Sequence, residues 1–254
     1  MQRCRTVCSQ AAQAFVWRVS IIASEISAFR VNEHVLRRQR NGASNATVNR
    51  ELNVLRRMFT LAQRYGLVQS VPYVPRLKES IPRQGFVERE SFTKLLAALP
   101  DHLRPVVEFL YYSGWRKNEA LRLTWEFVDL PGRTVRLNPA HSKNGEGRVL
   151  PLRGRLLELI EQQQTANGCG FVFQHRGRPL KDFRRAWQIA TESAGLKGLL
   201  IHDLRRSAVR NLVRSSVPES VAMKLTGHKT RSVFERYNIV SDSDLARAVE
   251  RICG

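Results

Sequence analysis

The sequence predicts a mainly α-helical protein with a small antiparallel β-sheet, arranged in two domains. Three observations support this fold class: apolar residues recur at helical spacing over much of the chain, a proline-rich stretch at residues 71–85 interrupts that pattern, and short strand-like segments follow it. We therefore expect a helical domain at residues 1–80 and an α+β domain at residues 86–254, joined by a linker at about 71–85.

The composition points to a polyanionic partner. The chain has 254 residues, is 43% hydrophobic and carries a formal net charge of +20. That charge is too positive for an ordinary metabolic enzyme and favours nucleic acid first and an anionic membrane second. No apolar run reaches the roughly 18 residues of a membrane span. The four cysteines form no C-x-x-C pair, so we expect no metal site, no disulfide framework and a reduced intracellular protein.

The first domain is expected to contain two helices. One runs through residues 26–39 and ends at Asn41-Gly42, and a stronger one runs from residue 46 to 65 and ends at Gly66. Residues 1–24 contain arginines and no acid, which superficially suits a transit peptide. We interpret them instead as an amphipathic helix or as a short, divergent domain start.

A basic stripe follows one face of the longer helix. Arg50, Arg57 and Arg64 recur every seven residues, which is about two helical turns. Their guanidinium groups form a ridge suited to phosphate contacts, so these residues are candidates for DNA binding. The alternative interpretation is a solvated helix face without a ligand.

The second domain is expected to begin near Phe86 and to mix helices with short strands. In chain order the expected elements are helices at Glu88–Leu99 and Leu103–Ser113, strands at Phe127–Leu130, Thr134–Leu137 and Val149–Leu152, a helix at 154–166, a short apolar strand at Phe171–Phe173 and a helix at 181–194. Pro131-Gly132 turns the first pair of strands, and Asn144-Gly145 is a strong hairpin signal before the third.

The last fifth of the chain combines two histidines, an arginine and a tyrosine at fixed spacing. His202 and Arg205 are three apart at the start of an expected helix, so they share one face of it. His228 follows Gly227, which ends the next expected helix, and Tyr237 lies near the end of a third. We expect these four side chains to converge on one pocket from three helix ends.

Each of these features has an ordinary explanation as a helix cap or as packing. The ordered string H-x-x-R, then G-H, then a tyrosine nine residues later is far rarer than its parts. It closely resembles the tyrosine recombinases, the phage-integrase family, whose pattern here is H-x-L-R, L-x-G-H and a tyrosine about nine residues on.

The resemblance extends upstream to residues 114–125, which match the family's first box, G-x-R-x-x-E-x-x-x-L-x-W. By this resemblance Arg116 is the first catalytic arginine. Glu119 is a supporting residue, because an acid three positions on can brace the arginine through an ion pair. The alternative for Glu119 is an ordinary surface pair with Arg122 or Lys117.

A lysine at an expected hairpin tip completes the set. Lys143 precedes Asn144-Gly145, and this family carries a lysine on such a hairpin that reaches into the active site. Arg148 is nearby but stands at the other end of the turn. The resemblance covers about residues 45–250.

The resemblance implies site-specific DNA recombination or integration, in which DNA is cleaved and rejoined through a 3′-phosphotyrosine intermediate. Tyr237 is then the nucleophile. Arg116 and Arg205 hold the non-bridging phosphate oxygens with planar donor forks, and His228 adds a donor to the same oxygens.

The remaining implied roles concern protons. Lys143 is the expected acid for the 5′ oxygen, and His202 positions a group or accepts a proton. Bond energy is kept in the phosphotyrosine linkage, so no metal, ATP or other cofactor is expected. A type IB topoisomerase and a non-catalytic DNA-binding relic of an integrase stay open as alternatives.

The expected partners are double-stranded DNA and further copies of the chain, as a homotetramer on two DNA sites in a cytoplasmic, nucleoid-associated protein. An accessory directionality protein stays open, and no membrane is expected. A helix at about 244–252 has an apolar side, and by the resemblance it docks on a neighbouring subunit. The alternative is that it packs on its own domain.

Overall fold

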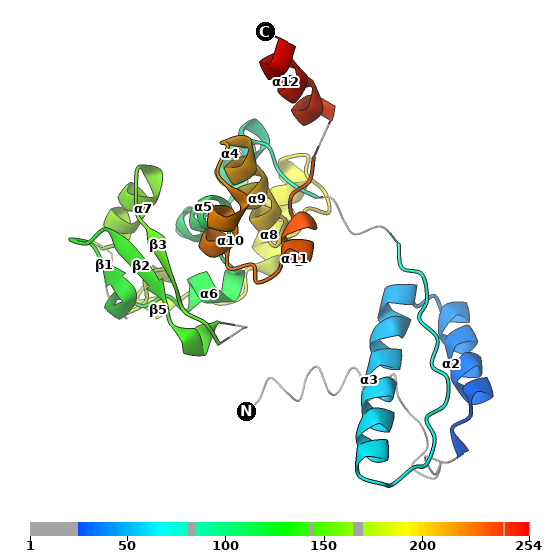
Figure 1. The fold of residues 1–254 in the computed structure, drawn as a ribbon. Coiled ribbons are helices and arrows are strands. Elements are labelled where there is room, and N and C mark those ends of the chain that lie inside the picture. The colour runs from blue at the N-terminus through cyan, green and yellow to red at the C-terminus, as the bar shows by residue number, and fades with distance from the viewer. Residues whose placement is uncertain (1–24, 81–84, 143–144, 165–169, 241, 254) are drawn as a thin grey trace. The chain divides into compact units, whose positions relative to one another are not determined.

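A computed structural model describes residues 25–80, 85–142, 145–164, 170–240 and 242–253 of the protein (Figure 1). The chain divides into two compact units, Met1–Pro82 and Arg83–Gly254. None of the helices in these described ranges has both the length and the apolar content needed to cross a membrane.

The described part of the first unit is a pair of helices with an extended segment running back along them (Figure 1). Helix α2 spans Ala28–Arg40 and α3 spans Asn45–Arg64, each with a serine N-cap whose side chain accepts a backbone N–H. Val31 of α2 and Leu52 of α3 are buried against each other's helix in one apolar cluster. The two helices therefore form close to the expected bounds.

Two polar anchors stabilise this helix pair. The carboxylate of Glu51 on α3 accepts three hydrogen bonds from the Arg38 side chain and lies 3.0 Å from Nε2 of His34, both on α2. The side-chain amide of Asn49 bonds to both the N–H and the carbonyl of Leu77, which fixes the extended segment along α3. A buried carboxylate and amide are tolerated here because each has its partners.

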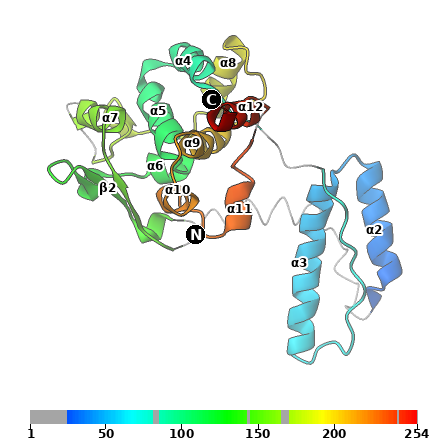
Figure 2. The same cartoon turned by 45° about the horizontal axis from the view of Figure 1, so that its top comes forward.

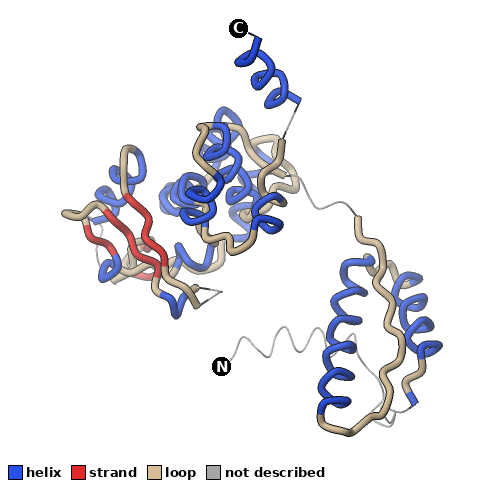
Figure 3. Tube along the Cα trace, in the orientation of Figure 1, coloured by secondary structure: helices blue, strands red, loops and turns tan. Residues whose placement is uncertain are grey.

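The second unit is mostly helical, with its strands gathered at one end (Figure 3). Its described helices are α4 (Arg89–Ala98), α5 (Arg104–Ser113), α6 (Lys117–Leu121), α7 (Arg155–Gln164), α8 (Arg184–Ser193), α9 (Asp203–Arg214), α10 (Glu219–Thr226), α11 (Arg231–Glu235) and α12 (Asp242–Cys253). Helix α5 lies at the centre, beside α9 in both views (Figures 1 and 2). Val106, Phe109 and Leu110 of α5 are almost completely buried and form the middle of the main core.

A three-stranded antiparallel sheet covers one side of this core. Its order is β1 (Val128–Asp129), β2 (Thr134–Leu137) and β3 (Arg148–Pro151), and Leu137 pairs with Arg148. Val135 and Leu137 are buried while the residue between them is exposed, as alternation along a strand requires. The strands thus form near their expected positions.

The connection between β2 and β3 differs from the expected tight hairpin. The pairing of Leu137 with Arg148 leaves residues 138–147 between the strands, and a single 3₁₀ turn at Pro139–His141 occupies part of this loop. A two-residue Asn-Gly turn would instead bring the strands together directly beside it. Asn144 itself lies outside the described residues.

The expected strand at Phe171–Phe173 is wrong. This segment makes one isolated bridge, between Thr124 and Phe171, and the second sheet lies just after it, in β4 (Gln174–His175) and β5 (Arg178–Pro179). Val172 and Phe173 are apolar because they fill the core. A short apolar run has the same appearance whether it is a strand or a buried loop, which explains the error.

Candidate active site

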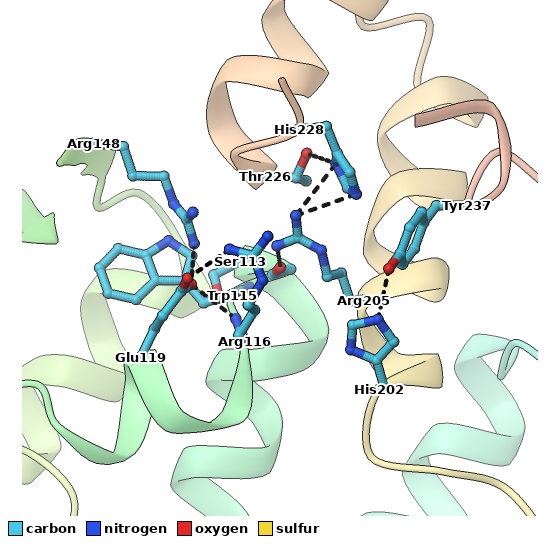
Figure 4. Close-up of polar contacts among 11 residues, drawn as sticks. Ser113, Trp115, Arg116, Glu119, Arg148, His202, Arg205, Thr226, His228 and Tyr237 are labelled. Carbon is cyan, nitrogen blue, oxygen red and sulfur yellow. Dashed lines mark hydrogen bonds and ion pairs between the residues drawn. The ribbon is translucent and has the colours of Figure 1, made fainter. Parts of the chain in front are cut away.

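Arg205 occupies the centre of the site (Figure 4). It lies on the first turn of α9, is 2% exposed, and donates a 2.6 Å hydrogen bond to the carbonyl of Gly114. Burial, and then the nearby positive charge of Arg116, lower its pKa to about 9, so the guanidinium remains a cation at neutral pH. A buried cation of this kind favours an anion beside it.

A glycine turn brings Arg116 to the same place. Gly114 ends α5 in the left-handed region, with φ of +64°, and a Cβ there would lie 3.1 Å from both Ala208 and Thr226. Only glycine fits this conformation and this close approach without strain. The chain then turns so that Arg116 becomes the N-cap residue of α6.

Glu119 is buried and braces two arginines. Its Oε1 accepts from Nη1 of Arg116 at 2.8 Å, and its Oε2 accepts from the Arg116 backbone at 3.0 Å and from Nη2 of Arg148 at 2.6 Å. Burial opposes the charged form, but Arg148 and Arg116 outweigh it and hold the pKa of Glu119 below its ordinary value. The alternative of a surface pair with Arg122 or Lys117 is wrong, because the Glu119 side chain is 2% exposed and pairs with Arg116 and Arg148.

Arg148 is the residue that sequence reasoning misplaced. It begins β3, yet its side chain is 10% exposed and points toward Glu119 over the ring of Trp115 (Figure 4). One sequence signal was available: Arg148 and Leu150 share a strand face by their spacing of two, and Leu150 faces the core.

His228 follows the end of α10 and lies against Arg205. Thr226 uses its only hydroxyl proton to bond the carbonyl of Ala222, so its oxygen, 2.7 Å from Nδ1 of His228, accepts from that nitrogen. Burial, and then Arg205, lower the pKa of His228 to about 3. The ring is therefore neutral, and its Nε2 accepts from Arg205 at 3.2 Å.

Tyr237 lies just beyond α11 and not within a helix as expected. The helix ends at Glu235, and the backbone N–H of Tyr237 bonds to the carbonyl of Phe234, whose side chain is fully buried. This anchored turn directs the tyrosine hydroxyl to a position 2.7 Å from Nε2 of His202. His202 is the N-cap residue of α9, so it projects from the helix start toward that hydroxyl.

The protonation state of His202 follows from its surroundings. Loss of hydration, and then the positive charge of Arg205, lower its pKa to about 4. At neutral pH the ring is uncharged and one of its nitrogens has a free lone pair. In the tautomer that carries its proton on Nδ1, Nε2 has the lone pair, and the 2.7 Å contact is then a hydrogen bond in which Tyr237 donates to His202.

The structure brings five of the expected residues together: Arg116, His202, Arg205, His228 and Tyr237 (Figure 4). A groove of about 850 Å³ opens beside Arg116 and His228, between β3 and α10. Lys143 lies outside the described residues. The expected DNA-binding arginines, Arg50, Arg57 and Arg64, are exposed on α3 of the first unit.

Comparison with known proteins places these residues in a family context. Residues 86–244 match the model of the Phage integrase family. The chain is 23% identical over 230 residues to the integrase of Salmonella phage P22, covering 84% of this chain and 59% of that relative. It is 27% identical over 245 residues to the tyrosine recombinase XerC of Roseiflexus castenholzii, covering 88% of this chain and 75% of that one.

A solved structure shows the same fold. A chain of the lambda integrase tetramer bound to a Holliday junction superposes with a TM-score of 0.76 at 18% identity, over 94% of this chain and 72% of that one. An identity this low supports the fold alone. The chain spans 59% of the length of the P22 relative.

Proposed function

Because the chain belongs to the phage integrase family of tyrosine recombinases, we propose that it performs site-specific DNA recombination. It would cleave and rejoin duplex DNA through a 3′-phosphotyrosine intermediate. The observation that carries this proposal is the placement of Tyr237, whose hydroxyl is bonded to neutral His202 and whose ring lies beside the buried guanidinium of Arg205. A nucleophile, a proton acceptor and an anion-binding group thus lie within one site.

The scissile phosphate binds to Arg116 and Arg205 in this proposal. Both carry planar forks of N–H donors that match two phosphate oxygens. Each is held in place before DNA arrives, Arg116 by Glu119 and Arg205 by the carbonyl of Gly114. Donors that are already oriented stabilise the additional charge of the phosphorane without reorganisation.

Tyr237 supplies the nucleophile. Its oxygen forms a bond to phosphorus while the bond from phosphorus to the 5′ oxygen breaks, and its proton passes to Nε2 of His202. Lys143 gives a proton to the departing 5′ oxygen. Rejoining reverses the sequence, with a 5′ hydroxyl from the partner strand as the attacking group.

His228 has a different role from a simple phosphate donor. Its Nδ1 proton is engaged by Thr226, and its Nε2 accepts from Arg205. In this state the ring orients Arg205. It becomes a donor to the phosphate once it takes up a proton, which the added negative charge of bound DNA favours.

We extend the proposal to domain roles and partners. The first unit, residues 1–80, serves as a DNA-binding domain that contacts phosphates through α3, and residues 86–254 are the catalytic domain. Four copies act on two DNA sites, as the tetrameric lambda integrase on a Holliday junction suggests. A nucleoid-associated location and an accessory directionality protein fit this function.

The tail helix α12 is proposed to join subunits. Asp244, in its first turn, pairs with Arg210 and Arg214 of α9, which fixes where the helix begins. Leu245 and Val249, one turn apart, are each 58% exposed. They form an apolar stripe suited to a neighbouring copy of the chain.

Covalent capture tests the function. The protein is incubated with a duplex library of random sequence and with supercoiled plasmid, and DNA that stays attached after denaturation is sequenced. We expect adducts at a defined sequence and none with Tyr237→Phe, which should still bind DNA. Adducts on Tyr111 or Tyr112, or plasmid relaxation without strand exchange, would overturn the assignment.

A further inference from the structure

We infer that Arg148 is a positioning residue that sets the geometry of Arg116 and connects the β-sheet to the anion site. The inference rests on the proposed function and identifies the residue that controls how Arg116 binds the phosphate. Arg148 acts through Glu119, which it contacts directly, and in the described structure it bonds to no other side chain of the site.

The first support is the way in which Glu119 is shared. Its carboxylate is 2% exposed and accepts from both Arg148 and Arg116. Arg148 donates a 2.6 Å hydrogen bond to one oxygen, and the side chain of Arg116 donates a 2.8 Å hydrogen bond to the other. Because Arg148 balances part of the buried negative charge, Arg116 keeps positive potential available for a phosphate.

The second support is the enclosure of the Arg148 guanidinium. It lies 4.9 Å over the ring of Trp115, which is 1% exposed. On another side it approaches Gly227 so closely that a Cβ on that glycine would overlap its Nη1 atom. Gly227 also has φ of +70°. Arg148 thus contacts the segments that carry both Arg116 and His228.

The third support is the backbone of Arg148. It is paired with Leu137 at the end of β2, so the sheet holds the backbone of Arg148 in place. Residues 138–147, which include Lys143, connect these two paired positions. The side chain of Arg148 is held among the helices and its backbone is held in the sheet. The residue therefore fixes the sheet relative to the helices.

This arrangement predicts a change of sign in the effect of Glu119. With Arg148 present, the carboxylate of Glu119 braces Arg116 and is useful. Without Arg148, the same buried carboxylate has Arg116 as its remaining cation, so it competes with the phosphate for that guanidinium. Removing the charge of Glu119 should then speed cleavage.

The experiment compares Arg148→Met, Glu119→Gln and the double variant. Cleavage is measured in single turnover on a nicked duplex bearing the captured sequence, and inorganic phosphate affinity is measured from the rise of the thermal unfolding midpoint. We expect Arg148→Met to slow cleavage about 100-fold, since a displacement of about 1 Å costs that much. Glu119→Gln should slow the parent but speed the Arg148→Met protein, in both cases about tenfold.

A matched control is Arg155→Met. Arg155 of α7 holds Glu108 of α5 with two hydrogen bonds of 2.7 and 2.9 Å, away from the residues of the site. The Arg155→Met protein should cleave at the parent rate even if its free energy of unfolding is lower. Arg148→Lys is measured beside Arg148→Met and should retain cleavage within about fivefold, because it keeps a positive charge near Glu119; it also keeps the test available if Arg148→Met fails to fold.

The outcomes separate the two claims. Arg148→Met with parental cleavage and phosphate affinity would overturn the inference, as would a double variant slower than both single ones, which would indicate a purely structural role. A loss with Lys as large as that with Met would also overturn it. A further outcome is that the parent cleaves no DNA while Glu119→Gln lowers the phosphate affinity of the parent and raises that of the Arg148→Met protein. In that case the proposed function fails and the role of Arg148 stands.

Discussion

The Nε2 atom of His202 lies 2.7 Å from the hydroxyl oxygen of Tyr237, although the two residues are 35 positions apart. His202 is the N-cap residue of α9, and Tyr237 follows α11. Since the imidazole is neutral, its tautomer protonated on Nδ1 leaves Nε2 free to accept the tyrosine proton. The free protein is thus prepared for the first step before DNA binds.

The titration of His202 is the first prediction. Reduced hydration and the charge of Arg205 disfavour the protonated ring, so its pKa should lie near 4, below the ordinary 6.5. The ring nitrogens should therefore show no titration between pH 6 and 8 in NMR spectra of the free protein. His202→Gln identifies the signals by their loss. A midpoint near 6.5 would contradict the proposed environment.

The second prediction concerns Lys143 as the acid for the leaving oxygen. Lys143→Ala should cripple cleavage of an ordinary phosphodiester, because the 5′ oxygen leaves poorly without a proton. A 5′-bridging phosphorothioate should restore much of the rate, since sulfur leaves without one. Single-turnover cleavage of both substrates measures this. An absence of rescue would remove Lys143 from the acid role.

The third prediction compares two glycines. Gly227 and Gly42 both have positive φ, +70° and +77°, so an alanine at either should cost roughly 1–2 kcal/mol in free energy of unfolding. At Gly42 a Cβ meets nothing within 4 Å, whereas at Gly227 it overlaps Arg148. Gly227→Ala should therefore also slow cleavage, and Gly42→Ala should not. Equal cleavage rates after correction for the folded fraction would count against the contact.

The fourth prediction concerns the arginine ridge of α3. If Arg50, Arg57 and Arg64 contact phosphates, changing all three to Gln should flatten the log–log salt dependence of DNA affinity by roughly two to three units, at about 0.9 per contact. Binding should weaken about equally for all sequences, because phosphate contacts do not read bases.

The control for this ridge changes three exposed arginines elsewhere in the same unit, Arg30, Arg40 and Arg76. They carry the same total charge but lie off the ridge, so the salt slope should change less. An unchanged slope in the ridge variant, with the protein still folded, would show that the ridge is only solvated and that the catalytic unit alone grips DNA.

The sequence by itself determined the features that depend on local spacing. Helix α3 could be predicted because its apolar residues repeat with the helical period. His202 and Arg205 could be placed on one helix start, and Gly227 at a helix end, because three-residue spacing and the left-handed conformation are local properties. The family resemblance rests on the same short strings.

Only the tertiary structure decided which distant groups touch. Arg148 and Glu119 are 29 positions apart, and their ion pair exists because the sheet packs on the helical core with Arg148 facing inward. The turn that directs Tyr237 depends on Phe234 being buried. The apolar Val172 and Phe173 lie in a buried loop rather than in a strand. Such contacts follow from packing between segments, which local periodicity does not encode.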